Sequence, residues 1–289
     1  MILVTGATGH FGKAAIQYLL KNGTAAKDIS ALVRDENKAV DLKQLGINLI
    51  KADYDDKASL IKAFAGIDKL LFVSGSDIAK RGLQQQNVVA AAIAAGVSYI
   101  LYTSFERGVE DGTSAVAFVA DAHLATEKAI KESGINYTIF RNNLYTDFIP
   151  MFIGDKVLET GIYWPSGEGK LAAAVREEMA EAAANVLTTT GHDGKEYFIS
   201  GEENVSFSDV AKYISKASGK EVLFVSPTQE EYIAALTNAG VPTEYINMFA
   251  GFAEGIKQGE FETTQHDLSK LLGRKATSVE TFLTNQYAS

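Results

Sequence analysis

Cysteine is absent from the 289-residue sequence. Its absence excludes disulfide bonds, thiol catalysis and metal sites built from thiolates. Histidine is also scarce, and its four copies stand far apart, at positions 10, 123, 192 and 266. Because this spacing fits no metal-ligand motif, we expect no metal centre.

An excess of positive charge and long apolar runs are lacking as well. The net charge is −9, which argues against nucleic-acid binding as the main task. The most apolar stretch, 88–101, is interrupted by Gly96 and is too short to span a bilayer. The chain starts directly with an apolar strand, without the basic segment and apolar core of a signal peptide. We therefore expect a cytoplasmic protein.

What the sequence does contain is a regular alternation of short apolar runs and amphipathic segments. Strands separated by helices of about 10–15 residues predict βαβ units. We expect an α/β fold of the Rossmann type, with a doubly wound parallel sheet and helices on both faces. The expected strands are 2–5, 28–34, 47–52, 69–74, 98–104 and 136–140, and the expected helices are 11–20, 37–45, 57–65, 81–95 and 120–133.

The regular pattern fades near residue 143. Residues 1–142 are predicted to form a nucleotide-binding domain, and residues 143–289 a smaller α/β substrate lobe that packs on it and does not fold independently. A ligand pocket is expected between the two parts. In the lobe we expect strands at 161–165, 195–200 and 221–226, and helices at 176–187, 206–217, 229–239, 244–258, 266–272 and 278–287.

A glycine turn joins the first strand to the first helix. Gly6, Gly9 and Gly12 stand three residues apart, and the apolar positions from Phe11 onward follow a helical period. Glycine can adopt positive φ, and without a Cβ it lets a pyrophosphate approach the backbone. The helix that follows offers free N–H groups to such a phosphate. The position of the triplet between strand and helix favours dinucleotide binding over an ordinary turn.

The end of the second strand predicts which dinucleotide binds. NAD sites usually have a carboxylate about 20 residues beyond the glycines, where it holds the ribose hydroxyls. This sequence has Arg34 at that place and Asp35 behind it. Because a guanidinium can pair with a 2′-phosphate, we favour NADP(H) over NAD(H). In the alternative, Arg34 is a solvated residue and Asp35 holds the ribose.

Other polar segments also follow strands. In a parallel sheet the carboxyl ends of the strands meet at one rim, where ligands bind. Asp53 is placed either to cap the next helix or to contact an adenine amino group. The remaining rim segments are Ser74–Ser76, Thr103–Phe105 and Arg141–Tyr145.

Six segments, taken together, resemble a known family. They are TGATGHFG at 5–12, LVR at 32–34 with Lys38, ADY at 52–54, YTS at 102–104, HLATEK at 123–128 and RNNLY at 141–145. The sequence resembles, over essentially its whole length, the atypical short-chain dehydrogenases/reductases of the NmrA-like kind. Within that group it is most similar to the bacterial type-2 NAD(P)H:quinone oxidoreductases, with the triphenylmethane dye reductases as near relatives.

The resemblance implies a role for each matching residue. Arg34 would hold the 2′-phosphate and Asp53 the adenine edge, while Asn143 would lie near the nicotinamide and the acceptor. The implied cofactor-binding residues are Gly6, Thr8, Gly9, His10, Phe11, Gly12, Arg34, Asp53, Ser74, Gly75, Ser76, Thr103, Ser104 and Arg141, and the candidate catalytic residues are His123, Asn143 and Tyr145.

One motif of ordinary short-chain dehydrogenases is missing. Those enzymes use Tyr-x-x-x-Lys as the proton donor, whereas the corresponding helix here has His123 and, four residues on, Glu127. Residues at this spacing share a helix face, and the carboxylate would favour a charged imidazolium that can act as an acid. The alternative is an ordinary surface ion pair.

The missing motif bears on the choice of acceptor. Hydride addition to a ketone gives a strongly basic alkoxide, for which a positioned acid is valuable. Addition to a quinone gives a phenolate whose conjugate acid has a pKa of about 10, like tyrosine. We therefore expect an NADPH-dependent reductase of quinones or similar conjugated small molecules. The alternative is a non-catalytic NADP(H) sensor like the regulator that gives the NmrA-like group its name.

Two expectations concern partners. The aromatic residues Tyr145, Phe148, Phe152, Tyr163 and Trp164 are candidates for a pocket that stacks on a flat acceptor, and at least half of them are expected to form the core of the lobe instead. The sequence does not reveal the oligomeric state, for which a homodimer is one candidate, and no binding to nucleic acid or membrane is expected.

Overall fold

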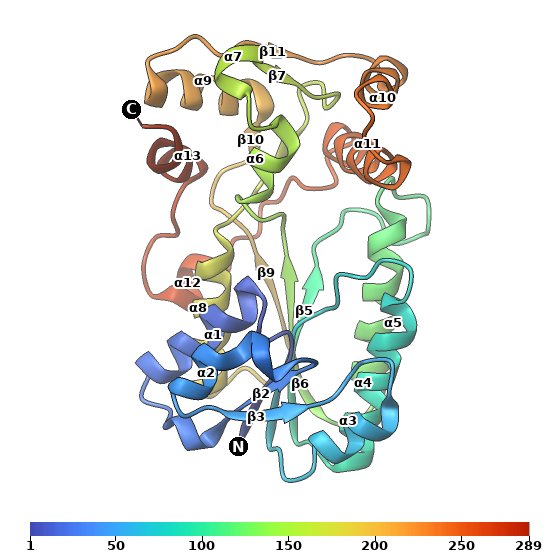
Figure 1. The fold of residues 1–289 in the computed structure, drawn as a ribbon, viewed down its shortest axis with the longest axis vertical. Helices are drawn as coiled ribbons and strands as arrows, with labels where there is room; N and C mark the ends of the chain where they lie inside the picture. The colour runs from blue at the N-terminus through green and yellow to red at the C-terminus, as the bar shows by residue number, and fades with distance from the viewer. Residues whose placement is uncertain (289) are drawn as a thin grey trace.

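A seven-stranded parallel sheet organises the larger part of the molecule in the computed structural model, which describes residues 1–288 (Figure 1). The strand order is β3-β2-β1-β4-β5-β6-β9. β1 pairs with β2 on one side and with β4 on the other, so the order reverses there and opens a crevice at the carboxyl ends. The predicted Rossmann-type fold is confirmed. The strands are β1 (Ile2–Val4), β2 (Ile29–Val33), β3 (Asn48–Lys51), β4 (Lys69–Phe72), β5 (Tyr99–Phe105), β6 (Asn136–Asn142) and β9 (Lys195–Ile199).

Helices cover both faces of the sheet (Figure 1). Over one face, α1 (His10–Lys21) packs against α8 (Arg176–Thr188), and α12 (Leu268–Leu272) packs on α8. Among residues 1–288, no helix combines the length and the apolar character that a bilayer span requires. The opposite face is covered by α3 (Lys57–Ala63), α4 (Arg81–Ala95) and α5 (Ala117–Glu132), and the short segments η1 (Ala26–Asp28), η2 (Glu36–Ala39) and α2 (Val40–Gln44) connect the first three strands.

Three segments late in the chain, α8, β9 and α12, complete the sheet part. β9 pairs in parallel with β6 and forms one edge of the sheet. α8 shares an apolar cluster with α1, in which Leu187 is buried together with Ile16 and Leu19. The placement of 176–187, 195–200 and 266–272 in the C-terminal lobe is therefore wrong, because a local apolar pattern does not reveal which sheet a strand joins or which face a helix covers. That residues 143–289 do not fold alone stays a prediction.

The other C-terminal elements form a smaller lobe beyond the carboxyl edge of the sheet (Figure 1). An antiparallel pair, β8 with β10, and a parallel pair, β7 with β11, join helices around an aromatic core. The elements are α6 (Phe148–Ile153), α7 (Val157–Thr160), β7 (Ile162–Tyr163), β8 (Lys170–Leu171), β10 (Val205–Ser206), α9 (Phe207–Ser218), β11 (Phe224–Val225), α10 (Gln229–Asn238), α11 (Thr243–Lys257) and α13 (Val279–Tyr287).

Most element boundaries lie close to the predicted ones because caps mark them. α4 spans Arg81–Ala95 as predicted and ends where Gly96 adopts a φ of 74°. Asp56 caps α3 by accepting hydrogen bonds from two backbone N–H groups. The single predicted helix 37–45 is wrong, since the segment divides into η2 and α2. Ala39, at the division, has a φ of −125° and leaves the helical region.

Candidate functional site

The loop between β1 and α1 has the backbone geometry that a phosphate-binding turn needs. Gly6 adopts a φ of 59°, and its carbonyl oxygen accepts from the Gly9 N–H at 2.9 Å. A Cβ on Gly12 would lie 2.4 Å from that same oxygen, so the first turn of α1 presses on the loop. Gly9 is the N-cap of α1 and has no side-chain acceptor, which leaves the first N–H groups of the helix open to a ligand.

The side chains of this loop fall into two groups. Thr8 and His10 are exposed, whereas Phe11 is buried in the apolar core between α1 and the sheet. Phe11 therefore anchors the turn and offers a ligand only its backbone. Thr8 and His10 present their side chains to the solvent above the loop.

Arg34 and Asp35 follow β2 at the same rim. Arg34 is exposed, and among residues 1–288 its guanidinium has no ion-pair or hydrogen-bond partner. The Asp35 carboxylate accepts from the Asn37 N–H at 3.0 Å and caps η2. The guanidinium of Arg34 is thus available to a ligand, while the carboxylate of Asp35 already accepts a hydrogen bond from the backbone of its own turn.

The turns after β3 and β4 are held by their own hydrogen bonds. Asp53 is half-buried and accepts from the backbone N–H two residues on, at 3.0 Å, while the predicted cap of α3 is provided by Asp56. The turn Ser74–Ser76 is anchored at its first N–H, which donates to Thr103 Oγ1 at 2.9 Å. Asp53 therefore lies close to Asp56, the cap of α3, and its second carboxylate oxygen accepts no hydrogen bond from residues 1–288.

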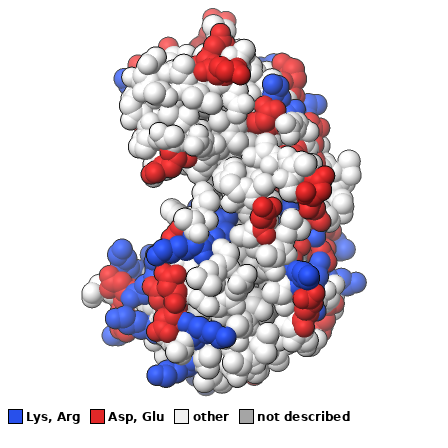
Figure 2. Space-filling model, turned by 90° about the vertical axis from the view of Figure 1, so that its right-hand side faces the viewer, with Lys and Arg blue, Asp and Glu red and all other residues white. Residues whose placement is uncertain are grey.

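The carboxyl ends of the strands face the lobe. Figure 2 shows a deep hollow between the sheet part and the lobe, with Lys and Arg side chains at its inner end. Because ligands of such sheets bind beyond the carboxyl ends at the switch point, this hollow is the candidate site.

His123, on α5, does not pair with Glu127. Its Nδ1 lies 2.7 Å from Tyr102 Oη, and its Nε2 lies 3.5 Å from a terminal nitrogen of Arg81. Since a guanidinium only donates, Nε2 accepts and the proton of the neutral ring sits on Nδ1. Burial, together with the charges of Arg81 and Arg107, holds the pKa of His123 well below its usual value. The predicted imidazolium and the alternative surface ion pair are both wrong, because the ring is buried and faces cations.

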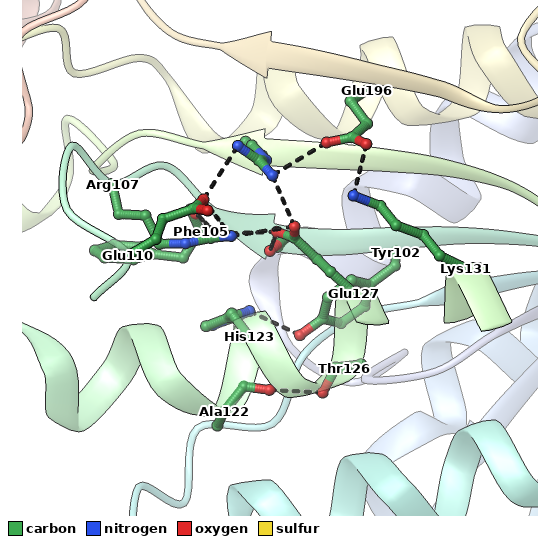
Figure 3. A network of polar contacts seen from close by, with 12 residues as sticks. Tyr102, Phe105, Arg107, Glu110, Ala122, His123, Thr126, Glu127, Lys131 and Glu196 are labelled. Carbon is green, nitrogen blue, oxygen red and sulfur yellow. Dashed lines mark hydrogen bonds and ion pairs between the residues drawn. The ribbon is translucent and has the colours of Figure 1, made fainter. Parts of the chain in front are cut away.

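Glu127 instead belongs to a buried ion network (Figure 3). Its carboxylate accepts from both terminal nitrogens of Arg107, at 2.9 and 3.1 Å, and from Arg141 at 2.9 Å. Ser104 donates to the same carboxylate. Burial raises the pKa of Glu127, but Arg107, Ser104 and Arg141 outweigh this effect and hold it below its usual value. Figure 3 shows His123 and Glu127 leaving α5 toward different partners.

Arg141, expected beside the cofactor, is surrounded by carboxylates. Its guanidinium lies 2.9 Å from Glu127, 3.1 Å from Glu196 and 3.4 Å from Glu110. It therefore connects β6 with α5, β9 and the loop after β5. This arrangement gives the side chain a structural task, and contact with the cofactor stays a prediction.

Asn143 ties the rim of the sheet to the lobe. Its side-chain amide donates to Glu106 at 2.9 Å and to the Phe261 carbonyl at 3.0 Å, and its Oδ1 accepts from the Leu144 N–H at 2.9 Å. Burial raises the pKa of Glu106 to about 7. Both amide protons of Asn143 are therefore in use, one of them on a carboxyl group that changes charge near neutral pH.

Tyr145 stands at the junction of sheet part and lobe. Its half-buried ring lies under Arg176, whose guanidinium carbon is 4.4 Å from the ring centroid, and Arg176 is held by Asp147 at 2.6 Å. Burial raises the pKa of Tyr145. The hydroxyl is therefore protonated at neutral pH, which makes it a hydrogen-bond donor.

Comparison with known proteins extends over nearly the whole of this architecture. The model of the NmrA-like family matches residues 1–283. The chain belongs to the NmrA-like family. Quinone oxidoreductase 2 of Escherichia coli is 38% identical to this family member over 280 residues, which cover 96% of each protein.

Two solved structures resemble this NmrA-like chain closely. One is the Citrobacter sp. triphenylmethane reductase complexed with NADP(H), with a TM-score of 0.90, 38% identity, and 99% of this chain and 100% of the other covered. The other is the NADPH-dependent quinone oxidoreductase QOR2 of Escherichia coli complexed with NADPH, with a TM-score of 0.90, 35% identity and the same coverage. Both likenesses include the sheet part and the lobe.

Sequence reasoning misses Arg81 in this NmrA-like chain. Arg81 is the first residue of α4, is only 9% exposed, and lies beside His123. A signal was available, because a cation in the first turn of a helix opposes the helix dipole. A predicted helix that begins with arginine therefore indicates that something other than helix stability places the charge there.

The aromatic residues of the lobe divide between core and surface. Phe152 and Trp164 are buried and stack at 4.7 Å, so they belong to the core. Tyr163 is 42% exposed, whereas Tyr145 and Phe148 are half-buried with 5.3 Å between their ring centroids. Of the predicted pocket, only the last two remain candidates for contact with a flat ligand.

Proposed function

We propose that the chain transfers hydride from NADPH to a quinone or a similar conjugated acceptor. The overall reaction converts NADPH, a quinone and one proton into NADP⁺ and a hydroquinone. The observation that carries the proposal is the open amide turn Gly6–Gly12 together with Arg34 after the next strand, which is exposed and forms no ion pair within residues 1–288. Relatives with this architecture include a quinone oxidoreductase and a triphenylmethane reductase that bind NADPH or NADP(H).

The residues of the rim fit this dinucleotide. The turn Gly6–Gly12 would hold the pyrophosphate through its N–H groups, because the Gly12 contact leaves no room for a side chain there. Arg34 would pair with the 2′-phosphate, since Asp35 is occupied by its own turn. Asp53 would accept from the adenine, and Ser74–Ser76 with Thr103 would border the ribose and the nicotinamide.

The acceptor end fits a reaction that needs no strong acid. NADPH supplies the hydride when bound, and the product of quinone reduction is a phenolate with a conjugate acid of pKa about 10, which water can protonate. His123 is neutral and has no proton on Nε2, so we assign it no acid role. Tyr145, with its protonated hydroxyl, would border the acceptor, and Asn143 would hold the rim in place.

Steady-state kinetics tests the proposal. The protein should oxidise NADPH in the presence of a benzoquinone or naphthoquinone, and Gly9→Val, which fills the phosphate turn, should not. No turnover across a broad quinone panel would refute the reductase. Binding of oxidised and reduced NADP(H) with different affinities, but without turnover, would instead identify the sensor alternative.

Two further expectations rest on the sequence alone. We propose a cytoplasmic location and a homodimer. Fractionation of the native cells and the hydrodynamic mass of the purified protein address them in turn.

A further inference from the structure

Arg81 is a buried cation that forms no ion pair within residues 1–288. It is 9% exposed, and among residues 1–288 no carboxylate lies within ion-pair distance of its guanidinium. Its Nε has no hydrogen-bond partner in the described part of the chain, and one terminal nitrogen lies 3.5 Å from His123 Nε2. Leaving a buried charge unpaired is costly, so a side chain kept in this state requires an explanation outside the stability of the folded chain.

Two neighbouring arginines, the buried Arg107 and the half-buried Arg141, do have carboxylate partners. Arg107 pairs with Glu127 and Glu110, and Arg141 pairs with both of these residues and with Glu196. Arg81 instead lies beside groups that are neutral at neutral pH, the imidazole of His123 and the phenols of Tyr102 and Tyr145. The charge of Asp77, one turn before it, acts on Arg81 only from beyond ion-pair distance.

His123 orients this cation without neutralising it. The ring is fixed at Nδ1 by Tyr102 at 2.7 Å, and the lone pair on Nε2 faces Arg81. A neutral acceptor holds one N–H group of the guanidinium and leaves its net charge unchanged. His123 therefore acts as a positioning residue for Arg81.

The location of Arg81 is the acceptor end of the proposed site. α4 begins just beyond the turn after β4, and the neighbours of Arg81 come from α5 and from the segment after β6. All three lie on the same side of the switch point, away from the Arg34 end. The cation therefore lies across the switch point from the turn Gly6–Gly12, which would hold the pyrophosphate.

We propose that Arg81 binds the carbonyl oxygen of the acceptor and stabilises the negative charge that develops there during reduction. The inference rests on the proposed function. One hydride leaves NADPH and reduces the quinone by two electrons, which gives NADP⁺ and the hydroquinone monoanion. Water then supplies the proton, because the guanidinium keeps its own. Donors aimed at developing charge in a site that excludes water are a large source of rate enhancement.

Two substitutions separate charge from shape. Arg81→Gln keeps an N–H donor toward His123 but removes the charge, and kcat/KM for a naphthoquinone should fall about a hundredfold. Arg81→Lys keeps the charge and should recover part of that loss. Lys80→Met removes an exposed charge next door, whose ammonium lies 3.7 Å from Asp55, and should stay within about twofold of the wild type. NADPH affinity, from nucleotide fluorescence, should change little in all three.

Ligand binding without turnover provides an independent measurement. 2-Hydroxy-1,4-naphthoquinone is an anion at neutral pH, whereas 2-methyl-1,4-naphthoquinone is neutral. Calorimetry on the nucleotide-free protein should show that the wild type prefers the anion, and that Arg81→Gln loses about tenfold or more of that affinity while binding of the neutral quinone is unchanged. A wild type that binds the neutral quinone as tightly as the anion overturns the proposal, even if a variant does not fold.

Other outcomes are equally decisive. If Arg81→Gln weakens NADPH binding by the same factor as kcat/KM and leaves anion binding intact, Arg81 serves the dinucleotide and the proposal is wrong. Unchanged kcat/KM in folded Arg81→Gln also refutes it, while the reductase stands. If the wild type turns over no quinone but anion binding still depends on Arg81, the proposed reaction fails and the anion site stands.

Discussion

The two ends of the rim differ in how far their polar groups are already paired. At the β2 end, Arg34 is exposed and has no partner in the described part of the chain, and the first N–H groups of α1 are open. At the β6 end, Arg141 is shared among three carboxylates and Asn143 has used both its amide protons. Polar groups without a partner in the protein indicate where a ligand binds, whereas polar groups that are already paired with one another indicate what stabilises the site. We call the end with Arg34 and the turn Gly6–Gly12 the receiving end, and the end with Arg141 and Asn143 the supporting end. Arg81 lies on the side of the supporting end but, unlike Arg141, has no carboxylate partner within residues 1–288.

A substitution that disrupts the ion network of the supporting end should have the largest effect of all, and this effect should be on the stability of the folded protein. Glu127→Gln removes the charge that pairs with the buried Arg107 and with Arg141, so the free energy of unfolding should fall by about 3–5 kcal/mol. Lys128→Gln is the matched control: its partner Glu132 is 3.8 Å away, both side chains are exposed, and the change should stay below about 0.5 kcal/mol. Urea denaturation measures both. Equal values for the two variants would show that the network is not a support.

Glu106, which accepts a hydrogen bond from Asn143 at the supporting end, should make the free energy of unfolding depend on pH. Burial raises its pKa from 4.5 to about 7, so the folded state binds a proton more tightly than the unfolded chain. This contribution is fully present below about pH 4.5 and is lost as the pH rises through about 7; its size is on the order of 3 kcal/mol. Glu106→Gln should abolish it. The difference in unfolding free energy between wild type and variant, measured at acidic and alkaline pH, should shift in favour of the variant as the pH rises, and a constant difference would contradict this.

At the receiving end, Gly12→Ala should weaken NADPH binding about a hundredfold. Its Cβ would lie 2.4 Å from the Gly6 carbonyl oxygen and 2.8 Å from Ala7 Cα, so the backbone of the turn must move. Gly82→Ala is the matched control: it lies inside α4, where a new Cβ would meet no atom of residues 1–288 within 4 Å apart from its neighbours and the backbone of its own helix, and it should leave the affinity unchanged. Fluorescence titration with NADPH compares them. Similar affinities for both variants would mean that the turn does not bind the dinucleotide.

The smallest expected effect is that of substitutions at Arg34, which test the preference for NADPH over NADH. Arg34→Ala should weaken NADPH about ten- to a hundredfold, with exposure favouring the lower figure, because charge-assisted hydrogen bonds to the 2′-phosphate are lost. NADH should change much less. Arg34→Asp should invert the preference, since a carboxylate repels the phosphate and accepts from ribose hydroxyls. Equal losses for both nucleotides in Arg34→Ala would disprove the assignment.

The sequence predicts the elements well and their partners poorly. Periodicity and caps are local, so α4 is found at its observed bounds and the order of strands and helices up to β6 is correct. The partners of a side chain come from elsewhere in the chain. His123 and Glu127 do share α5, but Tyr102 from β5 holds the first, and Arg107 with Arg141 holds the second. No spacing within the helix reveals this.

The supporting end is harder to predict than the receiving end for the same reason. The turn Gly6–Gly12 is a continuous segment whose backbone provides the function, so a motif captures it. The network around Glu127 draws on α5, β5, β6 and β9, and only the folded sheet brings these together. Arg81 is a charged residue at a helix start, and its burial depends on neighbours from two other elements.

The late arrival of β9 has a consequence for biosynthesis. β6 is made well before β9, and in the interval its N–H and C=O groups face no partner on that side. A nascent chain on the ribosome therefore carries an open strand edge until residue 199 has been added, and such an edge is a template for pairing with a neighbouring chain. α12, which packs on α8, is made later still. A fragment released after β6 would keep this edge permanently and would be prone to aggregate.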